Sequence, residues 1–230
     1  MTLALPEKFH LAVIMDGNGR WGERQKKSRI AGHEEGMKRL EEMFDAAAEF
    51  GVNTLTIFAF STENWKRSEF EVQSLMRIFN DYITTRTERL LGENVRVRFI
   101  GDKSPFSKKL IDAMVNLEKK TEGNTKLNLN VAMNYGGQDE ILRTVRRLTD
   151  AGITAPTAQE FEAHLDTAGS PQVDLMIRTS GEMRISNFML WQLAYAEMYF
   201  TDVLWPDFDK AELKKALDYY IGRDRRFGGV

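Results

Sequence analysis

A short stretch near the N-terminus, VIMDGNGRWGERQ at residues 13–25, combines residue types that could do chemistry. An apolar run ends there in Asp16, and three glycines follow with the spacing G-x-G-x-x-G: Gly17, Gly19 and Gly22. A glycine-rich turn between a strand and a helix can present backbone N–H groups to phosphate oxygens. The stretch therefore predicts an anion-binding turn, spanning Gly17–Arg20, with a carboxylate at its start.

The glycine spacing alone does not establish a dinucleotide site. Such a site needs an acidic residue after the second strand, about 20 residues beyond the glycines, to bind the ribose. That distance falls on Glu41 and Glu42, inside a predicted helix, whereas the second predicted strand ends near Phe60. Asp16 would also repel a bare pyrophosphate. A nicotinamide-dependent oxidoreductase is therefore the weaker alternative, and no G-x-x-x-x-G-K-[ST] motif supports a P-loop.

Asp16 fits better as a ligand of Mg²⁺, a hard cation that binds carboxylates and substrate phosphates together. Nearby arginines would supply charge-assisted hydrogen bonds to a diphosphate: Arg20, Arg29 and Arg67. Residues that follow a later predicted strand would form a second anion site: Arg178, Arg184 and Ser186. Two anion sites beside a magnesium ligand predict two phosphorylated substrates.

Short apolar runs alternate with helical patterns along the chain, which predicts an α/β fold with a mostly parallel central sheet and helices on both faces. The predicted strands are 10–15, 54–60, 95–101, 126–136 and 173–180. Ligands bind beyond the carboxyl ends of such strands. No repeat, low-complexity segment or clear boundary divides the sequence, so residues 1–230 are predicted to form a single domain.

The predicted helices cover 32–51, 68–91, 138–151 and 187–200, with one more between the third and fourth strands. Ser68 with Glu71, and Thr157 with Glu160, have the spacing of capping boxes at helix starts. Asp209 and Glu212 indicate the start of a last helix. The helix over 68–91 is too apolar for a narrow stripe, so it either packs between neighbours or lines a channel for a hydrocarbon chain.

Composition excludes several classes of function. The net charge of −2 gives no reason to expect nucleic acid as a partner. The chain has no cysteine and three histidines, so it has no thiol nucleophile and no histidine-rich metal cluster. The sequence shows no signal peptide, and no apolar run approaches the ~18 residues of a membrane span. We expect a cytoplasmic protein.

At this point the motifs resemble a known family, the cis-prenyltransferases, over nearly the whole chain from Phe9 to Gly229. The matching segments are HLAVIMDGNGRW, the GH at 32–33, FAFSTENWKR, NYGG, DLMIRTSGEMRISNFMLWQLAYAEMYFTDVLWPDF and RRFGG. The resemblance implies a Mg²⁺-dependent homodimer with an apolar tunnel beside a parallel sheet. It also implies repeated condensation of isopentenyl diphosphate onto farnesyl diphosphate, with each new double bond cis.

The product implied by the resemblance is a long-chain, C55 lipid diphosphate that carries cell-wall sugars. Such a product must reach a bilayer, so transient contact with the inner face of the membrane is an expectation. Predicted helical residues near Trp191 and Phe200 would serve that contact or, as we favour, the dimer interface. Family members that make shorter or longer chains remain an alternative, as does a non-catalytic partner subunit, although that would be expected to lack Asp16 or the arginines.

The resemblance also assigns residues by position. Asp16 matches the essential aspartate at the Mg²⁺ and diphosphate, and Glu197 matches a second metal-linked carboxylate. The matches to the allylic diphosphate site are Gly17, Asn18, Gly19, Arg20 and Trp21, with Arg29, His33 and Arg67 nearby. A mobile loop between the two sites matches Ser61, Thr62, Glu63, Asn64 and Trp65. The isopentenyl diphosphate site matches Arg178, Arg184, Ile185 and Ser186.

Further positions carry implied roles. Ala59 and Leu127 match positions associated with product length at the tunnel. Arg226 and Gly228 match a C-terminal segment that reaches the partner's active site. Relatives use Asn64 in the proton-loss step, but an amide is a poor base, so we expect Asn64 to position the group that accepts the proton.

Overall fold

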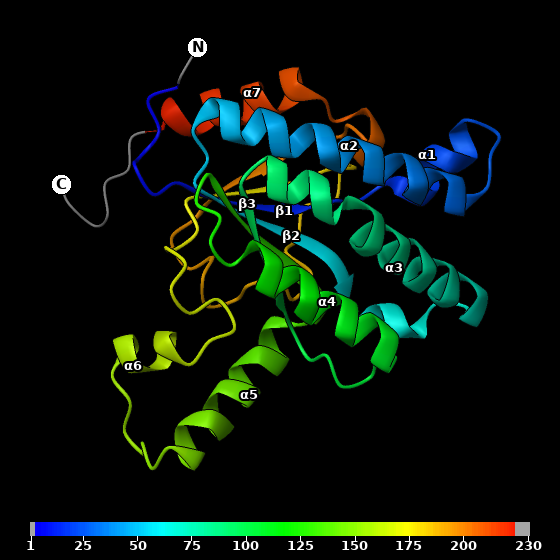
Figure 1. Cartoon of the computed structure of the whole chain (residues 1–230). Coiled ribbons are helices and arrows are strands. Elements are labelled where there is room, and N and C mark those ends of the chain that lie inside the picture. The colour runs from blue at the N-terminus through cyan, green and yellow to red at the C-terminus, as the bar shows by residue number, and fades with distance from the viewer. Residues whose placement is uncertain (1–2, 224–230) are drawn as a thin grey trace.

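A six-stranded sheet lies at the centre of the computed structural model, which describes residues 3–223 (Figure 1). The strand order is β3-β4-β2-β1-β5-β6, and every neighbouring pair is parallel. The strands are β1 (His10–Ile14), β2 (Thr54–Ser61), β3 (Val95–Ile100), β4 (Leu127–Tyr135), β5 (Leu175–Arg178) and β6 (Glu197–Phe200). The predicted parallel α/β fold is confirmed.

Helices cover both faces of the sheet. They are α1 (Asn18–Arg24), α2 (Arg29–Phe50), α3 (Glu69–Gly92), α4 (Lys108–Thr121), α5 (Gly137–Asp150), α6 (Ala158–Ala163) and α7 (Lys210–Ile221), with 3₁₀ turns η1 (Thr62–Lys66) and η2 (Trp205–Asp207). Figure 1 shows α5 and α6 on the opposite side of the sheet from α2 and α7. In the described part of the chain, no helix is long and apolar enough to cross a bilayer.

The alternation of side chains along β1 divides the core into two layers. Leu11 and Val13 belong to a large cluster with the apolar faces of α2, α3, α4 and α7. Ala12 and Ile14 belong to a smaller cluster with residues of the 185–196 segment. Because β1 is buried on both faces, its sequence is a continuous apolar run rather than an alternating one.

Three helix starts follow the predicted capping signals. Thr157 and Glu160 form the predicted capping box, and Asp209 accepts hydrogen bonds from the Ala211 and Glu212 backbone N–H groups. Ser68 accepts from the Glu71 N–H, as predicted, but the Glu71 carboxylate pairs with Arg67 instead of returning to Ser68. The cap at α3 is therefore one-sided, and Glu71 is available to the neighbouring site.

One predicted helix is wrong, and one short helix is not predicted. Helix α1 begins at Asn18 directly after the glycine turn, ahead of the first predicted helix at 32–51. Residues 187–200 do not form a helix: Asn187 and Met189 have positive φ angles of 61° and 44°, which no right-handed helix allows. The end of this segment is the edge strand β6, which pairs with β5 from Leu175↔Glu197 to Arg178↔Phe200.

Candidate active site

Asp16 and Arg178 meet at the point where the strand order reverses. From β1 the chain runs to β2 on one side of the sheet, and it later returns to β5 on the other side. Ile14, the last residue of β1, is in register with Arg178, the last residue of β5. The carboxyl ends of two strands at such a switch point form the usual binding crevice of an open α/β sheet. The predicted site therefore has the expected position in the fold.

The Asp16 carboxylate is held by two hydrogen-bond donors and a nearby guanidinium. Its Oδ1 accepts from the Gly17 N–H at 2.7 Å, and its Oδ2 accepts from Arg178 Nη2 at 2.9 Å. Arg20 Nη2 lies 3.6 Å from Oδ1. Burial raises the pKa of Asp16, but the hydrogen bond from Arg178 and the Arg178 charge outweigh it, so the pKa lies below its usual value. Asp16 is therefore an anion with fixed orientation at neutral pH.

Arg178 links this carboxylate to the second predicted anion site. Its guanidinium is almost fully buried, and Nη1 donates to the Arg184 carbonyl at 2.5 Å and to Ser186 Oγ at 2.7 Å. Arg184 itself is exposed and pairs with Glu182, while Arg20 donates to the Ser180 carbonyl. Arg178 thus contacts both of the other sequence-predicted residues, Asp16 and Ser186.

The glycine turn owes its sequence to helix packing as much as to any ligand. A Cβ on Gly32 of α2 would lie 1.9 Å from the Asn18 carbonyl oxygen, and a Cβ on Gly22 would lie 2.3 Å from the Ser28 carbonyl oxygen. Gly17, with φ of 103°, reverses the chain into α1. The glycines therefore allow α1 and α2 to touch backbone to backbone, which a dinucleotide fingerprint does not require.

A second charged cluster lies where α2 meets the start of α3. Glu71 Oε1 is 2.8 Å from Arg67 Nη1 and 3.9 Å from both Arg29 Nη2 and His33 Nε2. Burial lowers the pKa of His33 to about 4, with Arg67 contributing, so His33 is neutral at neutral pH. Sequence reasoning missed Glu71, because its position in the cap of α3 already explained a glutamate there.

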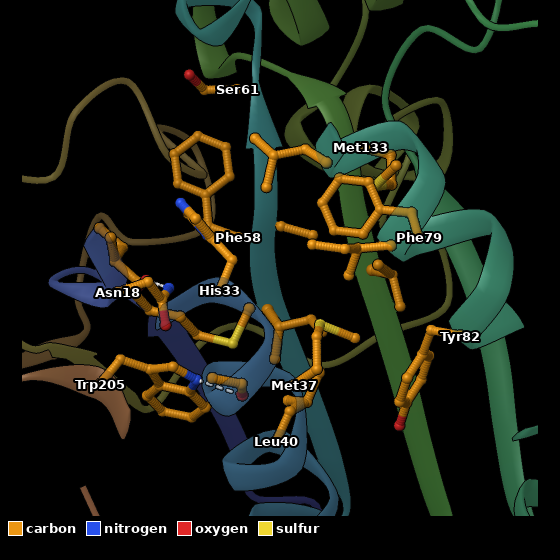
Figure 2. A pocket seen from close by; sticks show the side chains of 18 of the residues that line it. Asn18, His33, Met37, Leu40, Phe58, Ser61, Phe79, Tyr82, Met133 and Trp205 are labelled. Atoms are coloured by element: carbon orange, nitrogen blue, oxygen red, sulfur yellow. Dashed lines mark hydrogen bonds between the residues drawn. The ribbon is translucent and has the colours of Figure 1, made fainter. Parts of the chain in front are cut away.

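An apolar cavity of about 240 Å³ joins these two clusters to the interior (Figure 2). Polar groups line one end, and they include eight predicted site residues: Asp16, Asn18, His33, Ser61, Asn64, Arg67, Arg178 and Ser186. Apolar side chains line the rest, with Leu75, Phe79, Ile83 and Leu90 from α3. Of the two alternatives for the long helix, the structure agrees with the one in which its apolar side chains line a cavity.

Three buried polar atoms that belong to the cavity wall have no hydrogen-bond partner among residues 3–223: Asn18 Oδ1, His33 Nε2 and Arg178 Nε. Buried polar atoms are usually satisfied, so atoms of this kind at one end of a cavity indicate a polar ligand. The same cavity continues between apolar walls. The ligand that fits both ends has a polar head and a hydrocarbon tail.

The loop predicted between the two sites is the 3₁₀ turn η1. The Asn64 amide oxygen accepts from the Ser61 N–H at 3.0 Å and completes a capping box. Trp65 donates from Nε1 to Asn134 Oδ1 at 2.8 Å and packs edge-on against Phe60. Thr62 belongs to the same turn, and Glu63 accepts from Asn187 Nδ2 at 3.3 Å. Sequence reasoning missed Asn134, which is buried at the end of β4.

Two further predicted site residues, Trp21 and Ile185, do not line the cavity. Trp21 donates from Nε1 to Asp207 at 2.7 Å, and Ile185 packs on the smaller core cluster. Ala59 lines the cavity, whereas Leu127, the first residue of β4, does not. Leu129, two residues further along the same face, takes that place. Arg226 and Gly228 lie outside the described residues.

Glu197 is not brought to Asp16 within the chain. It begins β6 in register with Leu175, whereas Asp16 follows the residue in register with Arg178. Leu175 and Arg178 are three residues apart on β5, which is about 10 Å along the strand. Glu197 pairs instead with Arg223 at 3.3 Å. The role of Glu197 as a second metal-linked carboxylate therefore stays a prediction, and within one chain Glu197 pairs with Arg223 instead of lying beside Asp16.

The donor set at Asp16 fits Mg²⁺ only together with a substrate. Among residues 3–223 no group of three or more His, Asp or Glu side chains could hold a metal ion. Mg²⁺ commonly binds through one or two carboxylates and completes its octahedron with substrate phosphates and water. Asp16 is a fixed, partly exposed carboxylate beside predicted diphosphate ligands, so the residues present fit that mode.

Comparisons with known proteins agree with this geometry. The chain is 46% identical to an isoprenyl transferase of Aquifex aeolicus, over 100% of this chain and 99% of that protein. It is 48% identical to a ditrans,polycis-undecaprenyl-diphosphate synthase, (2E,6E)-farnesyl-diphosphate specific, of Vibrio cholerae, over 95% of this chain and 90% of that protein.

Two solved structures share the fold. A lavandulyl diphosphate synthase from Lavandula x intermedia, in complex with dimethylallyl diphosphate, matches with a TM-score of 0.90 and 36% identity over 95% of this chain and 97% of that one. A probable undecaprenyl diphosphate synthase from Campylobacter jejuni matches with 0.83 and 33%, over 97% and 100%. The family model described as "Putative undecaprenyl diphosphate synthase" matches residues 14–228, and the chain belongs to this family of prenyltransferases.

Proposed function

We propose that this protein is a prenyltransferase that condenses isopentenyl diphosphate repeatedly onto farnesyl diphosphate and forms an undecaprenyl diphosphate for cell-wall lipid carrier synthesis. The observation that carries the proposal is a single cavity with a cationic, partly unsatisfied polar end and long apolar walls. Relatives named for this reaction, at 44–48% identity, support the choice of substrates. The glycine spacing gives no support to a nicotinamide-dependent oxidoreductase, because the contact between α1 and α2 already requires Gly22.

In this proposal the two diphosphates have neighbouring places that meet at the Asp16–Arg178 pair. The farnesyl diphosphate head would lie at the start of α1 and beside α2, where the candidate ligands are Asp16, Gly17, Asn18, Gly19, Arg20, Trp21, Arg29, His33 and Arg67. The isopentenyl diphosphate would lie beyond β5, at Arg178, Arg184, Ile185 and Ser186. The hydrocarbon tail of the first substrate would then extend between α2, α3 and the sheet.

The reaction breaks the allylic C–O bond, joins the freed carbon to isopentenyl diphosphate and releases a diphosphate. Negative charge grows on the departing diphosphate, and fixed arginines and backbone N–H groups stabilise it. Mg²⁺ bound through Asp16 would add electrostatic stabilisation of that charge. Water must be kept from the cationic carbon, and the apolar walls around Phe79 and Met133 exclude it.

The last step removes a proton from the isopentenyl unit. Asn64 lines the cavity from η1, where its amide oxygen accepts from the Ser61 N–H, and we assign it a positioning role because an amide is a poor base. Its amide would hold the accepting group, which is a diphosphate oxygen, the Ser61 hydroxyl or water, within reach of that proton.

We also propose a homodimer in the cytoplasm, with transient membrane contact for product release. The edge strand β6 has no strand beyond it in the part of the chain that the structure describes, and all four of its residues are only half-buried. Tyr195, just before it, is 82% exposed. An exposed edge of this kind favours pairing with a second copy. Sedimentation at micromolar concentration measures this: a monomer would contradict the dimer without affecting the reaction.

Incubation with farnesyl diphosphate, labelled isopentenyl diphosphate and Mg²⁺ tests the function. We expect a ladder of products that ends at undecaprenyl diphosphate when the products are separated by chain length. A ladder that ends at a shorter or longer chain would keep the reaction and contradict the product. No product from a folded dimer would contradict the function and favour a non-catalytic partner subunit.

A further inference from the structure

Two helices, α2 and α3, form the wall of the cavity that faces away from the sheet. Met37, Leu40 and Phe44 line the cavity from α2, and Tyr82, Ile83 and Leu90 line it from α3. Figure 2 shows Tyr82 across the cavity from Met37 and Leu40. The position of one helix relative to the other therefore sets the width of the cavity.

The cavity is small for its proposed content. Its volume is about 240 Å³, whereas pockets for drug-sized ligands occupy roughly 300–1,000 Å³. A chain of eleven isoprene units is much larger than a drug-sized ligand. Because a packed interior has few empty spaces, the growing chain must displace part of the wall. Backbone hydrogen bonds join all strands of the sheet, which therefore resists separation. The contact between helices α2 and α3, called the seam below, is the part of the cavity wall that separates more easily.

An ionic network joins α2 to α3 across this seam, next to apolar residues that line the cavity. Glu41, next to Leu40, accepts from Arg86 Nε and from Arg89 Nη1, the latter at 2.6 Å. Arg89 also reaches Asp45 of α2 at 3.1 Å and Glu93 at 2.5 Å. The Glu41 side chain is only 15% exposed, so water screens its two pairs less than it screens an ordinary surface pair.

Tyr82 connects the network to the cavity. Its ring lines the cavity one helical turn before Arg86. Burial raises the pKa of its hydroxyl, and the Glu41 charge raises it further, which places the Tyr82 hydroxyl within the field of Glu41. A movement that separates Glu41 from the arginines would therefore also move the Tyr82 side of the wall.

We propose that the Glu41–Arg86–Arg89 clamp determines product length: it resists separation of α2 and α3, and elongation ends when the chain can no longer push the seam apart. The three residues are positioning residues, since they act through the cavity wall and touch no substrate. This inference rests on the elongation reaction proposed above.

Product ladders of Glu41→Gln test the clamp. The variant keeps the size of the side chain and removes the charge that both arginines contact. We expect its longest major product to gain at least one isoprene unit relative to the wild type, with the rate of the first condensation changed less than threefold. The control is Glu49→Gln, which lies on the same helix α2 as Glu41 but away from the cavity. It breaks the 2.5 Å pair between Glu49 and Lys210 of α7, and its product ladder should not change.

A charge swap separates the clamp from general damage. Glu41→Arg combined with Arg86→Glu, which leaves Arg89 with its Asp45 and Glu93 partners, should bring the ladder back toward that of the wild type, whereas Glu41→Arg alone should lengthen it. An unchanged or shorter ladder for Glu41→Gln, or a swap that restores nothing although circular dichroism shows it folded, would overturn the clamp. If the wild type itself makes no ladder of products, that result contradicts the proposed function on which the clamp rests.

Discussion

At the scale of single residues, few hydrogen-bond donors fix each polar group of the site, and two of these groups share the donor Arg178. Asp16 and Ser186 are both held by Arg178, so one buried guanidinium connects the two proposed diphosphate sites. Its Nε has no partner in the described part of the chain. A ligand oxygen there would complete the set, which explains why a buried arginine with a free N–H is tolerated.

Asn64→Ala tests the proposed positioning of the proton acceptor. The change removes the acceptor for the Ser61 N–H and so loosens η1 between the two clusters. A displacement of about 1 Å can lower a rate on the order of 10²-fold, and we expect a fall of that size in kcat with a smaller change in KM for farnesyl diphosphate. Steady-state kinetics measure both.

The matched control for this variant is Asn53→Ala at the opposite end of β2, where Asn53 accepts from the Thr54 hydroxyl. Its kcat should remain near that of the wild type. If Asn64→Ala retained full turnover, the positioning role would be lost.

At the scale of elements, the contact between α1 and α2 fixes the anion-binding turn. Gly32→Ala would place a Cβ against the Asn18 carbonyl, which belongs to that turn. We expect a loss of about 1–3 kcal/mol in the free energy of unfolding, as overpacking usually costs, and a large loss of activity because Asn18 must move. Urea unfolding and product formation measure the two effects.

Gly92→Ala is the matched substitution at the end of α3, where a Cβ would meet nothing within 4 Å. Its stability should stay unchanged or rise by up to about 1 kcal/mol, and its activity should not change. Equal behaviour of the two alanine variants would contradict the close approach of α1 and α2.

The sequence predicts most elements but not all, and the failures have physical reasons. The buried run HLAVIM and the capping signals at Thr157 and Asp209 are local, so they predict β1, α6 and α7 well. Residues 187–200 have a helical composition, yet β6 forms because the edge of β5 offers backbone partners from a distant part of the sheet. Tertiary hydrogen bonds override propensity there.

The same distinction applies to the candidate site. Strand ends could be predicted to converge, so the meeting of Asp16 with Arg178 follows from the sequence. The separation of Glu197 from Asp16 depends on the wrongly predicted helix and could not be found without the register of β6. Glu71 and Asn134 act through side-chain direction, which no spacing pattern reveals.

At the scale of the whole molecule, buried histidines make stability depend on pH. His10 lies inside the sheet, with Nδ1 at 2.7 Å from the Pro171 carbonyl and Nε2 at 2.7 Å from Thr56 Oγ1. Burial lowers its pKa from 6.5 to about 4, against the raising effects of Pro171 and Asp174. Below pH 6.5 the unfolded chain takes up a proton that the folded chain refuses until about pH 4.

The folded state is therefore most favoured above pH 6.5 and loses this contribution as the pH falls toward 4. Between pH 7 and pH 5 the loss for His10 is about 2 kcal/mol. We expect the free energy of unfolding of His10→Gln to fall by about 2 kcal/mol less than that of the wild type over this interval, as measured by urea unfolding. Parallel losses in the two proteins would mean that His10 is not held neutral.

The central claim is that the crevice at Asp16 carries out prenyl transfer, and Asp16→Ala tests it most directly. Product formation from farnesyl diphosphate, labelled isopentenyl diphosphate and Mg²⁺ is measured for this variant beside the wild type. We predict a loss on the order of 10³-fold or more, because the proposed metal ligand and part of the diphosphate site are removed together. An Asp16→Ala protein that forms undecaprenyl diphosphate at the wild-type rate would contradict the account.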